Sequence, residues 1–169
     1  FYALAEFEDP ALQLESARRF VMRRLPDPLP TALDAGRRYE HQRLRIGYLS
    51  GDFRMHAVSF LTAEVFELHN RERVEVYGLD YSPDDGSDMR QRVLKAFDVH
   101  VPLHQLSDAQ AAAQIARLEI DVLVDLTGLT AGSRFGILPF RPAPVQVSYL
   151  GYMGSSGLPG VDYVLADRF

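Results

Sequence analysis

The chain has 169 residues, the size of one ordinary domain, and its hydrophobic share of 47% and charged share of 24% are those of a globular protein. Its 18 Lys and Arg stand against 23 Asp and Glu, and the resulting net charge of -5 argues against a general nucleic-acid binder. The absence of cysteine excludes disulfides, thiolate metal sites and a cysteine nucleophile.

Neither end of the sequence indicates a targeting signal or a membrane anchor. No apolar run approaches the roughly 18 residues that span a bilayer, and the acidic first ten residues do not resemble a signal peptide. We therefore expect a cytoplasmic protein whose partners include no membrane and no nucleic acid. The chain begins at Phe1 without methionine and stops directly behind an apolar segment, so we interpret it as one domain of a larger protein.

The first forty residues predict a helix followed by an irregular connector. Asp9 and Pro10 are typical of a helix start, and apolar residues recur at helical spacing over residues 14–25. Three prolines between residues 26 and 30 end this helix and open the connector. We expect residues 1–43 to form a helical linker or appendage, and residues 44–169 to form the main domain.

From residue 44 onward, strand patterns alternate with helical patterns, which predicts a parallel sheet covered on both faces. In the helix over residues 57–69, four apolar side chains share one face: Phe60, Leu61, Val65 and Leu68. Right-handed crossovers then give an α/β, doubly wound Rossmann-like sheet of about six strands. Its central strands should be residues 44–49, 120–125 and 145–150. The other predicted elements are strands 74–81, 99–103 and 163–166, helices 87–97 and 107–118, and a short helical stretch after residue 133.

Ligands of such sheets bind at the carboxyl ends of the strands, which selects loops 50–56, 82–88, 127–133 and 151–160. His56 lies in the first of these loops, directly before a predicted helix. A neutral imidazole there can accept a proton or bind an anionic ligand, or it can simply cap the helix, and position alone favours neither. We expect His56 and residues 151–156 to lie at one edge of the sheet and to line one open concavity.

The segment 151–160 reads GYMGSSGLPG, and its glycines allow a backbone to approach a ligand closely. Ser155 and Ser156 could bond sugar or phosphate oxygens, but composition alone favours the plainer explanation, a loop that needs several positive φ angles. Asp125, at the end of a predicted strand, could face a ligand or meet a neighbouring N–H. No dinucleotide fingerprint, P-loop or metal-ligand spacing occurs, so we expect no metal.

Three blocks of the sequence carry a family resemblance: LRIGYLSGDFRMHAVSF (44–60), YSPDDGSD (81–88) and RPAPVQVSYLGYMGSSG (141–157). Together, and in this order, they resemble the amino-terminal half of the catalytic region of the protein O-linked N-acetylglucosamine transferases. The resemblance implies one of two Rossmann-like lobes that face a cleft, the GT-B arrangement. It also implies inverting transfer of N-acetylglucosamine from UDP-N-acetylglucosamine to Ser or Thr hydroxyls of proteins, without metal or other cofactor.

The resemblance also assigns site residues. The cleft histidine of the family falls on His56, which is then catalytic or substrate-orienting. The loop that lines the donor-sugar pocket falls on residues 150–154, where Met153 replaces the usual proline. This loop and the serine after it imply that five residues bind the substrate: Leu150, Gly151, Tyr152, Gly154 and Ser155.

The implied partners are the UDP-sugar donor, a protein or peptide acceptor and the carboxyl-terminal lobe of the same enzyme. Most nucleotide contacts in the family come from that second lobe, so we expect this lobe alone to be nearly inactive. The family's parent proteins carry tetratricopeptide repeats, of which this chain has none. Two alternatives stay open: a related glucosyltransferase that uses UDP-glucose, and a non-catalytic module that binds a nucleotide sugar.

Overall fold

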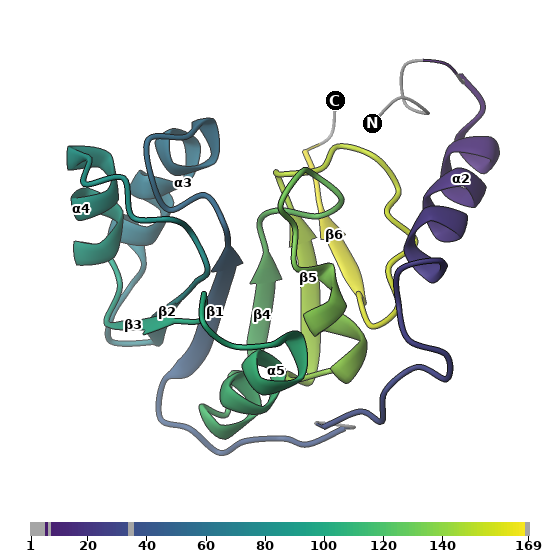
Figure 1. The fold of residues 1–169 in the computed structure, drawn as a ribbon. Helices are drawn as coiled ribbons and strands as arrows, with labels where there is room; N and C mark the ends of the chain where they lie inside the picture. The colour runs from purple at the N-terminus through teal and green to yellow at the C-terminus, as the bar shows by residue number, and fades with distance from the viewer. Residues whose placement is uncertain (1–5, 7, 34–35, 168–169) are drawn as a thin grey trace.

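The computed structural model of the chain describes residues 6, 8–33 and 36–167, and it contains one sheet with helices on both faces (Figure 1). The predicted alternation of strands and helices is confirmed, with ends that shift by one to three residues. The elements, in chain order, are α2 (Pro10–Met22), β1 (Leu44–Ser50), α3 (Ala57–Leu68), β2 (Val74–Asp80), α4 (Asp88–Lys95), β3 (Val99–Pro102), α5 (Asp108–Arg117), β4 (Val122–Asp125), η1 (Phe135–Phe140), β5 (Val145–Tyr149) and β6 (Tyr163–Leu165).

The six strands are all parallel and lie in the order β3-β2-β1-β4-β5-β6. This is the doubly wound order, in which the chain starts in the middle, winds outward to one side and then returns to wind toward the other. The three strands expected at the centre, β1, β4 and β5, all have a neighbour on each side. The predicted fold class is therefore confirmed.

Alternate residues of the strands build two separate apolar cores. In the register of the sheet, Tyr48 lies beside Val124 and Val124 beside Val147, and this row packs with α3 and α4. Leu49, one residue further, points to the other face, where it packs with α5, η1 and α2. Figure 1 shows α3 and α4 together on one side of β1, with α5 across the sheet from them.

The helix predicted after Asp9 is α2, and the Asp9 carboxylate caps it by accepting a hydrogen bond from Ala11 N at 2.8 Å. Val21 is fully buried in the same apolar cluster as the sheet residue Leu49. Gly157, in the loop before β6, lies so close to α2 that an added Cβ would meet the Arg18 side chain at 2.6 Å. The predicted appendage thus packs onto the sheet. Its division from the main domain at residue 43 stays a prediction, and residues 1–5, 7, 34 and 35 lie outside the described part.

The side of α3 that packs on the sheet is not the one that the apolar pattern indicated. Phe60, Leu61 and Leu68 are 58%, 63% and 76% exposed, whereas the buried positions include Val58 and Phe66. The helix is apolar on two sides, so periodicity alone could not choose between them. Phe66 is fully buried, and its ring lies 4.7 Å from that of Tyr48 in β1 and 5.0 Å from that of Phe97 after α4, which places this side of α3 on the sheet.

Candidate active site at the carboxyl edge of the sheet

Two loops of interest leave the same edge of the sheet. The β1–α3 loop (residues 51–56) follows the end of β1, and the β5–β6 loop (residues 150–162) follows the end of β5. Both strands run parallel within one sheet, so their carboxyl ends lie at one edge. The expectation that His56 and the glycine-rich segment share this edge is confirmed.

His56 is the N-cap of α3. Its backbone is extended, with φ -144° and ψ 150°, and its Nδ1 accepts a hydrogen bond from Val58 N at 3.3 Å. The side chain is 37% exposed, and Nδ1 also lies 3.7 Å from Asp52 Oδ1. The capping role that the sequence left open is therefore real, and it leaves part of the ring accessible from the edge of the sheet.

The cap decides which nitrogen of a neutral His56 carries the proton. A ring nitrogen that accepts the Val58 N–H has no hydrogen of its own, so the proton of the neutral ring resides on Nε2. In this tautomer the ring can donate a hydrogen bond from Nε2. It would take up a proton only at Nδ1, after that nitrogen releases the Val58 amide and with Asp52 beside it. The geometry suits a substrate-orienting donor better than a base that acts through Nε2.

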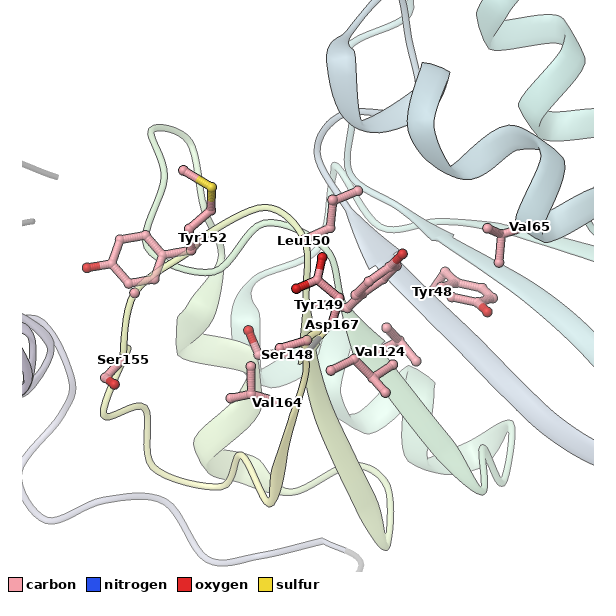
Figure 2. Close-up of a pocket in the computed structure, with 14 residues that line it drawn as sticks. Tyr48, Val65, Val124, Ser148, Tyr149, Leu150, Tyr152, Ser155, Val164 and Asp167 are labelled. Atoms are coloured by element: carbon pink, nitrogen blue, oxygen red, sulfur yellow. The ribbon is translucent and has the colours of Figure 1, made fainter. Parts of the chain in front are cut away.

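A cavity of about 970 Å³ opens beside the start of the β5–β6 loop (Figure 2). In Figure 2, Leu150, Tyr152 and Ser155 lie along the loop on one side, and Tyr48 and Val65 lie on the other. Four of the five predicted substrate-binding residues line the cavity, namely Leu150, Tyr152, Gly154 and Ser155. Met153 lines it as well.

The expectation that His56 lines the same concavity is wrong for this cavity, because His56 is not among its lining residues. The cavity is lined by residues of β1, β4, β5, β6 and α3, whereas the β1–α3 loop that carries His56 is bonded to the segment after β2, for example through Phe53 N to Ser82 Oγ at 2.8 Å. The lining also includes Tyr48 and Tyr149, which the motif reading missed. Their placement on one face of β1 and β5 was the signal that could have found them.

Gly151, the fifth predicted substrate-binding residue, is half-buried and is not among the residues that line the cavity. A Cβ there would clash with the carbonyl oxygen of Leu126, so only glycine permits the loop to lie against the end of β4. The preceding Leu150 has φ +68°, in the left-handed region that favours glycine. Such backbone strain costs about 1–3 kcal/mol and is frequent at functional sites.

Asp125, at the end of β4, bonds neighbouring N–H groups rather than facing an open space. Its carboxylate accepts from Thr127 N at 3.1 Å and from Gly128 N at 2.9 Å, and it is almost completely buried. Burial raises the pKa of this carboxyl to about 6, although the two amide bonds act in the opposite direction. Gly128 in turn contacts Tyr152, since a Cβ on Gly128 would clash with the Tyr152 side chain. Asp125 thereby fixes the backbone of Gly128, against which Tyr152 of the β5–β6 loop packs.

The described residues contain neither a metal-binding cluster nor a helix that could span a membrane. Within residues 6, 8–33 and 36–167, no group of three or more His, Asp or Glu side chains could hold a metal ion. No helix in that part of the chain is long and apolar enough to cross a bilayer.

The chain is a doubly wound α/β domain, a class in which ligands bind in the crevice at the carboxyl ends of the strands, where both the β1–α3 loop and the β5–β6 loop lie. Comparison with known proteins narrows that class. The sequence model of Glycosyl transferase family 41 matches residues 29–169. The chain therefore belongs to this family of glycosyltransferases.

Named relatives agree with that assignment. The chain is 36% identical over its whole length to the probable UDP-N-acetylglucosamine--peptide N-acetylglucosaminyltransferase SEC of Arabidopsis thaliana. It is 40% identical over 75% of its length to the UDP-N-acetylglucosamine--peptide N-acetylglucosaminyltransferase of Caenorhabditis elegans. It covers only 18% and 11% of those two proteins.

A solved structure of a mutant O-GlcNAc transferase from Thermobaculum terrenum superposes with a TM-score of 0.77 at 32% identity. The match covers 96% of this chain and 31% of that one. The chain thus corresponds to one lobe of a larger glycosyltransferase, as the resemblance of its motifs implied.

Proposed function

We propose that this chain is the amino-terminal catalytic lobe of an enzyme that transfers N-acetylglucosamine from UDP-N-acetylglucosamine to Ser or Thr hydroxyls of proteins. Support comes from the family and from the relatives, whose names state this donor and a peptide acceptor. The observation that carries the proposal is the common edge at which His56 and the loop of Leu150 to Ser155 lie.

In this proposal the two loops have different tasks. His56 donates from Nε2 to an oxygen of the acceptor or of the sugar and holds it in line for attack at the anomeric carbon. The β5–β6 loop contacts the donor sugar with Leu150, Tyr152, Gly154 and Ser155, and Gly151 keeps that loop close to the end of β4.

A second lobe completes the cleft. The chain spans 31% of the solved relative and 18% of the plant one, so most of each relative lies outside the matched part. We assign the diphosphate of the donor to that missing part, where positive groups would stabilise the charge on the leaving group. Transfer is proposed to need no metal or other cofactor, and the cytoplasmic location expected from the sequence stays a prediction.

The test is a transfer assay with the full-length protein that carries this lobe. A Ser- and Thr-containing acceptor protein is incubated with UDP-N-acetylglucosamine or with UDP-glucose, and the modified residues are located by mass spectrometry. The proposal expects N-acetylglucosamine on hydroxyl side chains. Glucose on asparagine would favour the related glucosyltransferase, and donor binding without transfer to any acceptor would favour a non-catalytic module.

A further inference from the structure

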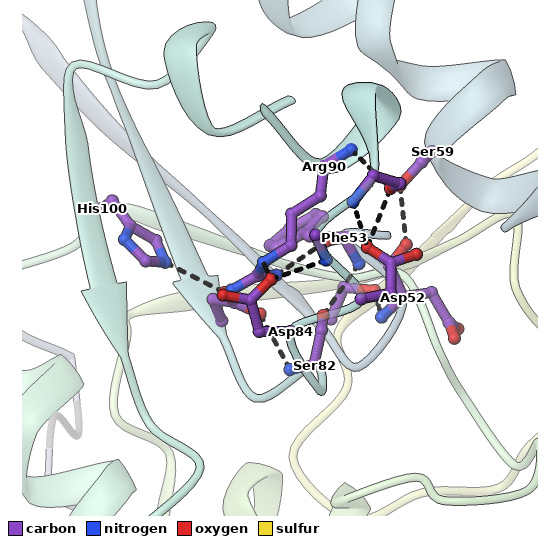
Figure 3. Close-up of polar contacts among 12 residues, drawn as sticks. Asp52, Phe53, Ser59, Ser82, Asp84, Arg90 and His100 are labelled. Atoms are coloured by element: carbon purple, nitrogen blue, oxygen red, sulfur yellow. Dashed lines mark hydrogen bonds and ion pairs between the residues drawn. The ribbon is translucent and has the colours of Figure 1, made fainter. Parts of the chain in front are cut away.

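Three side chains from the β2–α4 loop and from α4 bond the backbone of the β1–α3 loop. Figure 3 labels two of them, Ser82 and Arg90, beside Phe53. Ser82 Oγ accepts a hydrogen bond from Phe53 N at 2.8 Å, and Arg90 donates to Phe53 O at 2.7 Å. Asp85 Oδ2 accepts from Met55 N at 2.8 Å. The backbone N–H and C=O of Phe53 and the backbone N–H of Met55 are thus all bonded by side chains from another part of the chain.

These side chains are themselves held in place. Arg90 forms a buried ion pair with Asp80 at 2.9 Å, and the two side chains are only 10% and 2% exposed. The other Asp80 oxygen accepts from Ser82 N at 2.8 Å, and His100 Nε2 lies 2.9 Å from the oxygen that faces Arg90. We call Asp80, Ser82, Asp85 and Arg90 the clamp.

The β1–α3 loop is also anchored from below. Phe53 is fully buried, and its ring lies 5.0 Å from that of Phe97 and 6.0 Å from that of Phe66. Ser59, in the first turn of α3, donates to the carbonyl of Asp52 at 2.6 Å. These contacts already connect β1 to α3, so the clamp adds three further bonds to residues that lie one and three positions before His56.

We infer that the clamp is a positioning device for His56, an inference that rests on the proposed function of that residue. An orienting hydrogen bond needs its donor within a fraction of an ångström of the productive place, and a misplacement of about 1 Å costs on the order of 10²-fold in rate. A residue in a short loop obtains that precision only when the loop backbone is fixed. The clamp fixes it at Phe53 and Met55, and the cap to Val58 fixes the ring beyond.

The test uses kinetics of the full-length protein with Ser82→Ala and Asp85→Ala, each alone and combined with His56→Asn. The clamp variants should lower kcat on the order of 10²-fold and leave the KM for the donor unchanged. In the His56→Asn background the same substitutions should lower kcat less than threefold, because the group that they position is gone. Asp85 lies at the surface, so its variant keeps the test decisive if Ser82→Ala fails to fold.

Ser107→Ala is the matched control for Ser82→Ala. It also removes a serine hydroxyl that accepts a backbone N–H, in this case at the N-cap of α5, and Ser107 contacts neither loop. It should leave kcat unchanged. Hydrogen exchange of residues 51–57 should become faster in the clamp variants and stay unchanged in the control.

Two results overturn the inference, and they are distinguishable. If His56→Asn itself retains full turnover, the role of His56 in the proposed function fails, and the positioning role fails with it. If His56→Asn is impaired but the losses multiply in the double variants, the proposed function stands and the clamp is structural only.

Discussion

At the carboxyl edge, the β1–α3 loop and the start of the β5–β6 loop are held by different physical means. The far end of the β5–β6 loop, at Gly160 and Asp162, is bonded by the side chains of Arg141 and Gln146. The β1–α3 loop is fixed by directional hydrogen bonds from buried and half-buried side chains, above all those of Ser82 and Arg90. The β5–β6 loop begins instead with a strained Leu150 and with Gly151, which is pressed against the backbone of Leu126. Its next residues lie at the cavity, where Met153 is 91% exposed.

This difference fits the two tasks that the proposed function assigns. A group that must donate one hydrogen bond in one direction requires a backbone fixed by directional bonds. A wall of a sugar pocket requires close approach to its support, which glycine supplies because it has no side chain. The following predictions test whether the two loops really depend on these different contacts, beginning with the largest expected effect.

Arg90→Met should lower the free energy of unfolding by about 3–5 kcal/mol, because it removes the guanidinium from the buried Asp80 carboxylate and leaves that carboxylate only the His100 ring nearby. Urea unfolding of the two proteins measures this. Arg92→Met, two residues further on the same helix, is the control: its ion pair with Glu67 lies at the surface, and its loss should cost far less than the loss of the Arg90 pair. Equal losses for both variants would refute the buried clamp.

Gly151→Ala should cost about 3 kcal/mol, because the new Cβ meets the carbonyl of Leu126, a backbone atom that cannot turn away. Gly132→Ala separates this effect from backbone strain, since Gly132 has φ +76° but open space around it. That control should cost about 1 kcal/mol. Thermal or urea unfolding compares the two, and a Gly151→Ala protein as stable as the control would contradict close packing of the β5–β6 loop.

Asp125 should make stability fall as pH rises between about 4 and 6. Burial raises its folded pKa to about 6 from 3.8, so in this window the folded state binds more protons than the unfolded one, and the ionised form opposes folding. The free energy of unfolding, relative to Asp125→Asn, should decrease by up to about 1.4 kcal/mol per pH unit. Urea titrations at several pH values measure the difference, and a flat difference would show that the carboxyl is not desolvated.

Met153→Ala should change the free energy of unfolding by less than about 0.5 kcal/mol, because the side chain is 91% exposed. If Met153 contacts the donor sugar, the KM for UDP-N-acetylglucosamine should rise in the full-length protein, while kcat changes little. An unchanged KM would remove Met153 from the donor pocket. A large loss of stability would show that the Met153 side chain is packed against the protein and is not exposed.

The sequence predicted the strands and which three of them are central, because parallel strands buried on both faces read as near-continuous apolar runs. It also predicted the edge at which His56 and Gly151 lie, since that follows from chain direction alone. The side of α3 that packs on the sheet could not be predicted, because Phe60 and Phe66 lie on different sides of a helix that is apolar on both.

The interior of the site was less predictable than its edge. The clamp depends on pairings between residues separated by about thirty positions, such as Phe53 with Ser82, and no local pattern encodes them. The acidic segment is one example: within YSPDDGSD (81–88), the Asp85 carboxylate accepts hydrogen bonds from Ser87 and also from the Met55 amide, thirty positions away. That bond is the main reason why the pKa of Asp85 falls to about 2.

The central claim is that His56 orients the reacting groups and does not bind the nucleotide. The most direct measurement compares kcat and UDP affinity of the full-length protein with those of His56→Asn, because Asn keeps the cap on Val58 and removes the imidazole. Turnover should fall on the order of 10²-fold or more, while UDP affinity by calorimetry and the melting temperature should stay unchanged. Full turnover in the folded variant, or a loss of UDP affinity as large as the loss of rate, would contradict it.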